Sequence, residues 1–196
     1  MFPATSWTLI RKAGDNDRES LDRFARSYER PIRAYLGKRG FTGADQDDLC
    51  QDVFLRLLKA GSLGRATAER GRFRSYLLAT VVHVVQDRLR KKPEAPESEV
   101  EPRTADPDFD REWAFELTTR AFERLEKEHP GYHETLRAHM DERETDRQKL
   151  WIARGRLAAL IRKEIALTCA SEHDYEEEVE LLDSLVGGIR EARKKD

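Results

Sequence analysis

Helical periodicity recurs along most of the chain, and signals for β-strands are nearly absent. Apolar residues return every three to four positions, which is the spacing of an amphipathic α-helix. The one β-branched run, TVVHVV at 80–85, is flanked by residues that continue the helical pattern, so we predict it as helix. The sequence therefore predicts an all-α protein, with helices at 5–12, 17–38, 45–60, 71–91, 110–128, 131–141, 145–168 and 174–194.

The segment 93–108, PEAPESEVEPRTADPD, interrupts this pattern. It carries four prolines and six acidic residues and has no periodic apolar face. Such a composition is typical of a linker, because it offers too little apolar surface to pack into a core. We expect this segment to join two small helical modules, 1–92 and 109–196.

Charge and hydropathy indicate where the protein resides. The formal net charge is only −2, so no overall field points to a nucleic-acid partner and charge must be read locally. The first residues, MFPATSWTLIRKAGD, lack the basic region and long apolar run of a signal peptide. No apolar run approaches the ~20 residues of a membrane-spanning helix. We therefore expect a cytoplasmic protein.

The sequence shows no pattern of catalytic or metal-binding residues. Cys50 and Cys169 are far apart and form no CxxC pair, so we expect two free thiols. His129, His133 and His139 lack the HExxH spacing of a zinc site. GxGxxG, P-loop and GxSxG motifs are absent as well. The sequence thus favours a binding protein over an enzyme, with no metal and no cofactor.

The segment 45–59, DQDDLCQDVFLRLLK, predicts an amphipathic helix. Its apolar stripe consists of Leu49, Val53, Phe54 and Leu57. The other side carries Asp47, Asp48, Gln51 and Asp52. Taken alone, this pattern is that of an ordinary helix with a solvated acidic face. A docking surface for a basic partner is the functional alternative.

The next predicted helix, 71–91, begins with aromatic residues and ends with cations. Phe73 and Tyr76 lie near its start, and DRLRKK follows its apolar middle. Cations suit the C-terminus of any helix because they interact favourably with the helix dipole. Rings and cations together also suit single-stranded nucleic acid, since rings stack on unpaired bases and cations follow the backbone.

In combination, these two helices and the Gly-containing loop between them resemble region two of bacterial extracytoplasmic-function (ECF) RNA polymerase sigma factors. The upstream stretch ESLDRFARSYERPIRAYLGKR is similar to the opening helices of that family, so the resemblance covers roughly 5–92. Tyr76 stands where Trp is common, and Val82 and His83 stand where Arg-Asn is usual. The matching positions are Asp45, Asp47, Asp48, Leu49, Gln51, Asp52, Phe54, Leu57, Phe73, Leu77, Asp87, Arg88 and Arg90.

The resemblance implies roles for particular residues. The polymerase core would contact Asp47, Asp48, Gln51, Asp52 and Phe54. The unwound −10 element of the promoter would contact Phe73, Tyr76, His83, Arg88 and Arg90. The loop 60–72 would accept a base flipped out of the non-template strand.

The C-terminal half resembles region four of the same family. REWAFELTTRAFERLEKEHPGYHETLRAHM is similar to its first helices, and RQKLWIARGRLAALIRKEIALT to its basic recognition helix. Only DERETDR lies between them, whereas two helical turns alone need ~8 residues. The resemblance thus implies a shortened helix-turn-helix, in which the recognition helix lacks a rigid neighbour. We expect weak DNA binding with little sequence choice, through Arg147, Lys149, Arg154 and Arg156.

The sequence leaves two functional hypotheses. The first is an ECF sigma factor that binds core polymerase and directs promoter recognition and melting. The second is a sigma-like interaction protein that binds polymerase or a regulator without opening promoters. The expected partners are RNA polymerase core and promoter DNA, and an anti-sigma factor is a further partner that the resemblance suggests.

Overall fold

The computed structural model describes residues 18–58, 72–90, 105–169 and 171–186, with side chains from residue 24 onward. Every secondary-structure element in these ranges is an α-helix, which confirms the all-α prediction. The order is α2 (Arg18–Lys38), α3 (Gly43–Leu58), α4 (Phe73–Arg90), α5 (Pro107–Glu128), α6 (Pro130–Met140), α7 (Arg147–Ala166) and α8 (Glu172–Val186). The predicted helix 5–12 lies outside the described residues.

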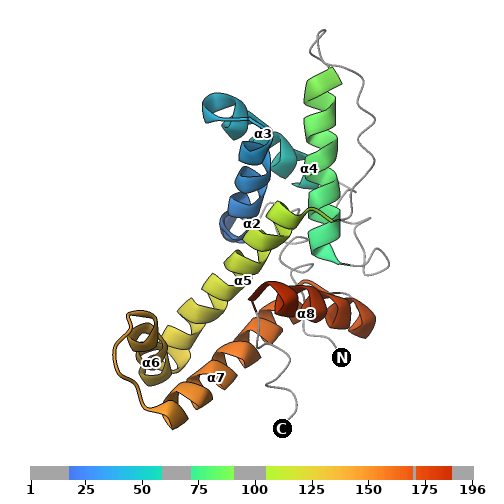
Figure 1. Cartoon of the computed structure of the whole chain (residues 1–196). Coiled ribbons are helices and arrows are strands. Elements are labelled where there is room, and N and C mark those ends of the chain that lie inside the picture. The colour runs from blue at the N-terminus through green and yellow to red at the C-terminus, as the bar shows by residue number, and fades with distance from the viewer. Residues whose placement is uncertain (1–17, 59–71, 91–104, 170, 187–196) are drawn as a thin grey trace.

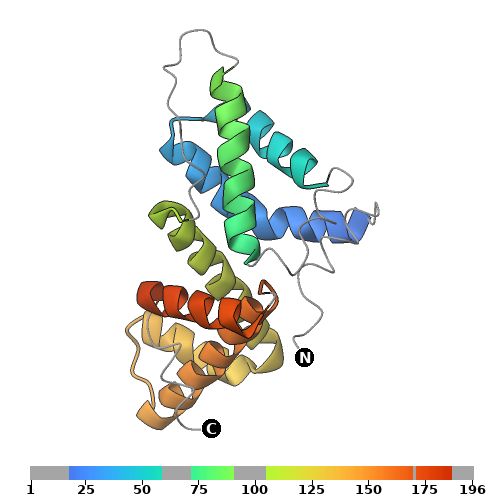
Figure 2. The ribbon, with the colours of Figure 1, turned by 90° about the vertical axis from the view of Figure 1, so that its right-hand side faces the viewer.

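The helices form two groups that α5 joins (Figure 1). Helices α2, α3 and α4 make up one group, and α6, α7 and α8 make up the other. The long helix α5 packs against α2 in the first group and against α6, α7 and α8 in the second. Figure 2 shows α8 directly below the start of α4, with α6 and α7 on its other side.

Helix α4 is central to the first group. Nine of its residues are buried, among them the β-branched run that was predicted as helix. Leu77, Val81 and Val84 carry this packing, together with Leu49 and Val53 of the apolar stripe of α3. Because the buried residues of α4 point to more than one side, neighbouring helices cover it on several faces.

The start of α5 differs from the sequence prediction. The helix begins at Pro107, inside the segment 93–108 that was predicted as a linker. Asp106 caps it, since its carboxylate accepts from the backbone N–H groups of Asp108 (3.2 Å) and Phe109 (3.0 Å). A capping residue followed by proline at the first helical position is a strong helix start. The stretch TADPDF at 104–109 was assigned to the linker from its prolines and acids, so the helix start was missed.

The starts of α7 and α8 follow the same local chemistry. Asp146 accepts from the N–H of Lys149 at 2.7 Å and so caps α7. At the start of α8, Ser171 Oγ accepts from the N–H of Asp174 (3.1 Å), and the Asp174 carboxylate accepts from the N–H of Ser171 (3.2 Å). This reciprocal pair is a capping box, which satisfies two backbone donors that the helix cannot.

One hydrophobic core runs through both groups of helices. Its residues include Phe24, Tyr28 and Ile32 of α2, and Phe109 and Trp113 of α5. The predicted modules 1–92 and 109–196 therefore share packed side chains in this structure, and the boundary between them stays a prediction.

Candidate functional site

The outer face of α3 is acidic and exposed. Asp47, Asp48, Gln51 and Asp52 all lie on it, as the helical pattern predicted. Leu55 lies on the same face and is 60% exposed. An exposed apolar side chain of this size gains stability when a partner removes it from water. Sequence reasoning missed Leu55, although its position off the stripe Leu49, Val53 and Leu57 is visible in the sequence.

Asp47 and Phe54 of the predicted polymerase-contact residues are held by contacts with α2. Asp47 accepts from Arg33 Nη1 at 2.7 Å, which ties the start of α3 to α2. Phe54 is half-buried and its ring meets that of Phe24 edge-on, with centroids 6.0 Å apart. The part of the predicted contact surface that faces solvent most freely is therefore formed by Asp48, Gln51, Asp52 and Leu55, which we call the α3 outer face.

Three of the predicted DNA-contacting residues form a stripe along α4. Tyr76, His83 and Arg90 recur at intervals of seven residues, so they lie along one side of the helix. His83 and Arg90 are exposed, and Tyr76 is half-buried. The His83 ring donates from Nδ1 to the carbonyl of Ala79 at 2.8 Å, which orients the imidazole. We call these three residues the α4 stripe.

Phe73 does not belong to this stripe. Its ring has no exposed surface and lies in an aromatic cluster with Phe24, Tyr28 and Trp113, at centroid distances of 6.0, 4.8 and 6.3 Å. A ring enclosed in this way cannot stack on a base unless the core opens. The base-contacting role predicted for Phe73 therefore does not fit this conformation, because the first turn of α4 packs against α2 and α5.

Arg88 is held against α3. Its Nη2 lies 3.3 Å from a carboxylate oxygen of Asp45 and 3.8 Å from one of Asp48. A second link joins Arg56 of α3 to Asp87 of α4 at 2.6 Å. The hydrogen bond from Arg56 holds the pKa of Asp87 below its ordinary value. These pairs fix the α3 outer face relative to the α4 stripe, although each exposed pair contributes little stability by itself.

The four predicted cations of α7 are all exposed, but they lie on two sides of the helix. Residues seven positions apart return to the same side, and residues two apart lie on nearly opposite sides. Arg147 and Arg154 therefore form one flank, and Lys149 and Arg156 form the other. Trp151, which is 61% exposed, lies on the flank of Arg147 and Arg154, because it follows the first by four residues and precedes the second by three. Sequence reasoning assigned no role to this tryptophan.

Helix α6 packs against α7, which changes the expectation for the shortened helix-turn-helix. The Arg154 guanidinium donates to His139 Nε2 of α6 at 2.9 Å. The segment before α7 is short, as the sequence showed, but α6 itself supplies the rigid neighbour. The sequence predicts α6 as the helix 131–141, but its similarity to the first helices of region four gave no indication that it supports α7.

A buried charge cluster joins α4 to the C-terminal helices, and sequence reasoning missed it. Arg74 of α4 donates from Nε to both carboxylate oxygens of Glu178 in α8 (2.9 and 3.2 Å) and from Nη1 to Asp110 in α5. Arg74 is 3% exposed and Glu178 is fully buried. Burial raises the pKa of Glu178 and of Asp110, although Arg74 acts in the opposite direction on both. No sequence pattern connects residues 104 positions apart.

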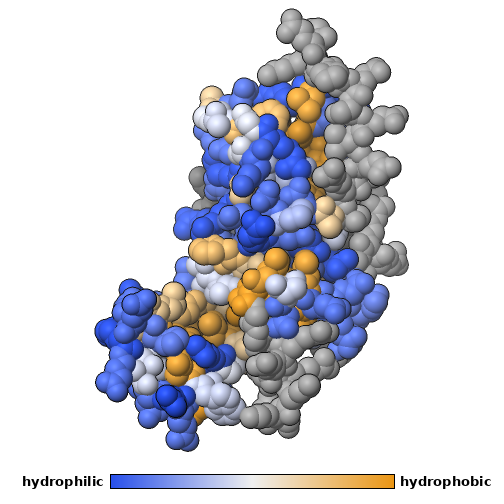
Figure 3. All heavy atoms as spheres, viewed as in Figure 1, coloured by the Kyte–Doolittle hydropathy of each residue, from blue (hydrophilic) through white to orange (hydrophobic). Residues whose placement is uncertain are grey.

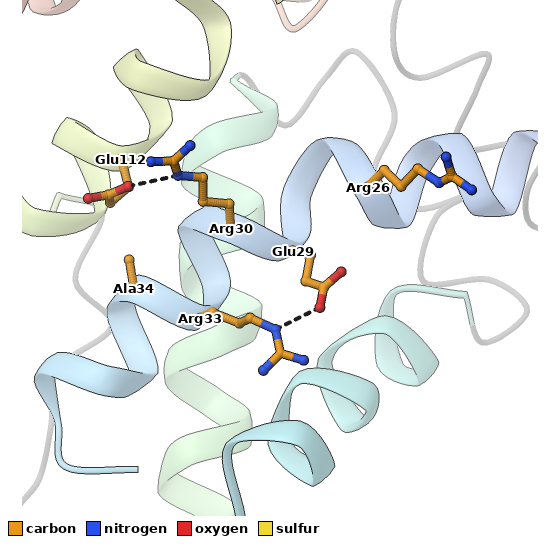
Figure 4. Close-up of a pocket in the computed structure, with 6 residues that line it drawn as sticks. All are labelled: Arg26, Glu29, Arg30, Arg33, Ala34 and Glu112. Atoms are coloured by element: carbon orange, nitrogen blue, oxygen red, sulfur yellow. Dashed lines mark hydrogen bonds and ion pairs between the residues drawn. The ribbon is translucent and has the colours of Figure 1, made fainter. Parts of the chain in front are cut away.

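A groove with a volume of about 540 Å³ lies between α2 and α5 (Figure 4). Arg26, Glu29, Arg30, Arg33, Ala34 and Glu112 line it. Its arginines face carboxylates of the same chain, since Arg30 lies 3.4 Å from Glu112 and Arg33 lies 2.6 Å from Glu29. This internal pairing leaves little positive charge for an anionic ligand. None of the sequence-predicted site residues lies in this groove.

The described residues hold no group of three or more His, Cys, Asp or Glu side chains that could bind a metal ion. Cys50 and Cys169 are both buried and unbridged. Burial raises the pKa of the Cys50 thiol to about 11 and that of Cys169 to about 12.

Among the described helices, none is long and apolar enough to cross a bilayer. The visible surface in Figure 3 is mostly hydrophilic.

Comparison with known proteins agrees with this picture for the N-terminal helices. Residues 24–93 match the family model of Sigma-70 region 2, a stretch that contains α3, α4 and most of α2. This part of the chain is therefore similar to region 2 of sigma-70 factors. No curated protein and no solved structure matches the chain with significant similarity.

Proposed function

We propose that this protein is a sigma factor of the ECF type, which binds RNA polymerase core and directs it to promoters. The observation that carries the proposal is the pairing of two surfaces inside the sigma-70 region 2 domain. The α3 outer face and the α4 stripe are fixed to each other by the Arg88 and Arg56 ion pairs. One surface would hold the polymerase while the other contacts the separated DNA strands.

The polymerase contact is assigned to the α3 outer face. Its acids would meet a basic surface, and Leu55 would supply an apolar anchor at the centre. Complementary charge steers association and excludes wrong partners, while a desolvated apolar side chain contributes affinity. Asp52 is the best test position, because it is exposed and takes part in no ion pair within the described residues.

The promoter contact is assigned to the α4 stripe, with Tyr76 as the stacking residue and His83 and Arg90 as polar and cationic contacts. Aromatic side chains stack on unpaired bases with ~1–3 kcal/mol per base. The family resemblance alone assigns the loop 60–72 the role of accepting a base flipped out of the non-template strand. Apart from Arg72, this loop lies outside the described residues. Phe73 is assigned a structural role, because its ring is buried.

The C-terminal helices are assigned to region four. Helix α7 would contact the DNA backbone through one of its two cationic flanks, with α6 as its support. Phosphate contacts need only charge and an accessible surface, so they would give salt-dependent binding with little sequence choice. We further propose that the protein acts in the cytoplasm, where polymerase is found, and that an anti-sigma factor is a further partner.

The test is binding to purified core polymerase, followed by run-off transcription on genomic fragments. Asp52→Lys should weaken core binding by an order of magnitude or more, since a charge reversal opposite a basic surface costs several kcal/mol. Glu126→Lys is the matched control, because Glu126 is an exposed acid of α5 without an ion pair in the described residues. Equal core affinity of the two variants would contradict the assignment of α3.

A second candidate function is supported by the covered start of α4. A sigma-like protein that binds polymerase without opening promoters would need the α3 outer face but not an accessible α4. Run-off transcription separates the two functions. Initiation from any promoter fragment supports the sigma factor, whereas core binding without transcription from any fragment supports the non-initiating protein.

A further inference from the structure

The start of α4 is covered by C-terminal parts of the chain. The backbone N–H of Phe73 donates to the carbonyl of Thr168, just after α7, at 3.1 Å. The Phe73 ring lies against Trp113 of α5. In the same turn, Arg72 and Arg74 face the carboxylates of α8. Figure 2 shows α8 lying across this end of α4.

The contact between α8 and the start of α4 is mainly electrostatic. Arg72 lies 3.4 Å from Glu177 and 3.9 Å from Glu178, and Arg74 pairs with Glu178. The apolar contribution of α8 to the core is limited to the buried Val179 and Leu182 and the half-buried Tyr175 and Leu181. Charges removed from water lose much of the stability that they gain by pairing. Helix α8 is therefore held by specific contacts rather than by a large apolar interface.

The carboxylates of α8 occupy positions that suit phosphates. Arginine binds carboxylate and phosphate with the same donor geometry, so the two groups compete for one guanidinium. Arg72 and Arg74 lie at the same end of α4 as Tyr76, the stacking residue of the α4 stripe. Nucleic acid that follows this stripe toward the start of the helix would meet the acids of α8 instead of the two arginines.

We propose that α8 is a releasable acidic segment that occupies the cationic start of α4 in competition with single-stranded DNA. In the closed form seen here, Glu177 and Glu178 take the place of phosphates on Arg72 and Arg74. In the open form, α8 leaves and the strand contacts both arginines. The inference deepens the proposed function and rests on its assignment of single-stranded DNA to α4.

The experiment compares two variants of the full chain, Glu177→Lys and Glu176→Lys. Both acids are exposed neighbours on α8, and both substitutions change the net charge equally. Of these two acids, Glu177 forms an ion pair with Arg72 and Glu176 does not, so the reversal of Glu177 places a cation against the start of α4. Binding is measured by fluorescence anisotropy of a labelled single-stranded oligonucleotide. Hydrogen exchange of the Phe73 amide reports closure directly, because this amide is bonded to Thr168.

We expect Glu177→Lys to bind the oligonucleotide about threefold to fivefold more tightly than Glu176→Lys, in line with the loss of one exposed ion pair. The Phe73 amide should also exchange faster in Glu177→Lys. Equal affinities and equal exchange in the two variants would overturn the competition by α8 and leave the proposed function standing. Absence of binding in every form would overturn the DNA-binding part of the proposed function, and this inference with it.

Discussion

Trp113 of α5 stacks on Tyr28 of α2, with ring centroids 5.5 Å apart and planes 13° from parallel. Both rings are almost fully buried. This contact joins a helix of the stretch that matches the Sigma-70 region 2 model to the first helix after the segment 93–104. The two groups of helices should therefore unfold together rather than one after the other.

Trp113→Ala tests this coupling. Removing a buried tryptophan typically costs ~3–5 kcal/mol, because apolar contacts are lost and a cavity remains. Trp151→Ala is the control, since Trp151 is mostly exposed and its removal should change stability by less than ~0.5 kcal/mol. Urea unfolding followed by circular dichroism gives both values. A wild-type protein that unfolds in two separate transitions would contradict the shared core.

Asp106 should stabilise the protein in two separable ways. It caps α5 and forms an ion pair with Arg39 at 2.8 Å. Asp106→Ala loses both contributions and should cost ~1–2 kcal/mol for the cap alone. Asp106→Asn retains an acceptor for the backbone N–H groups and loses only the charge. If the two variants are equally stable, the cap contributes nothing.

The same residue gives a pH dependence with a defined sign. Burial raises the pKa of Asp106, but the hydrogen bonds from Arg39 and from the backbone of Phe109 outweigh it, so the pKa is lowered below 3.8. A lowered carboxyl pKa contributes stability that is present above 3.8 and is lost as the pH falls through the lower, folded-state value. The stability difference between wild type and Asp106→Asn should therefore shrink in strong acid. A difference that grows on acidification would contradict this.

Much of the fold could be predicted from sequence, because helical periodicity is a local property. All seven described helices were expected, with starts and ends mostly within three residues. The start of α5 was missed because the composition of its capping residues, Asp106 and Pro107, resembles that of a linker. Helix α6 was found, but its packing on α7 depends on tertiary contacts that periodicity does not encode.

The candidate site was harder to predict, because it depends on contacts between residues that are distant in the sequence. Exposure of Asp48, Asp52 and His83 followed from the position of each residue relative to the apolar stripe. The burial of Phe73 did not, because it depends on Tyr28 and Trp113, which approach from distant parts of the chain. Arg74 was invisible as a functional residue, since its partners Asp110 and Glu178 are 36 and 104 positions away.

The two cationic flanks of α7 should differ in their contribution to duplex DNA binding. Arg154 is hydrogen-bonded to His139 of α6, whereas no such bond holds Lys149 or Arg156 within the described residues. We therefore expect the Lys149 flank to provide the phosphate contacts. Replacing Lys149 and Arg156 by Ala should reduce the slope of log affinity against log salt by about two, since each phosphate contact contributes about 0.9. Anisotropy titrations with a duplex at several salt concentrations measure this slope.

The control replaces Arg147 and Arg154 by Ala, which removes the same charge from the other flank. We expect a smaller change in salt slope from this pair. A larger change would show that the flank next to α6 faces the DNA. If both pairs reduce the slope equally, α7 does not present a single flank to the duplex.

The final prediction concerns the buried carboxyl of Glu178. The charged and titratable groups around it are Arg72, Arg74, Asp110 and Cys169. Burial raises its pKa above the ordinary 4.5. The folded protein therefore holds this proton more tightly than the unfolded chain, so stability rises as the pH falls from the raised value toward 4.5.

Glu178→Gln should reproduce the protonated form at every pH, because its amide keeps an oxygen acceptor for Arg74. At neutral pH the variant should be more stable than wild type, because the neutral amide avoids the cost of burying an ionised carboxylate. The two proteins should converge as the pH approaches 4.5, where wild-type Glu178 is protonated in the folded state. Urea unfolding of both proteins across this pH range measures the difference. A glutamine variant that is less stable at neutral pH would show that ionised Glu178 holds α8 in place through Arg74, and that this pairing outweighs the cost of its burial.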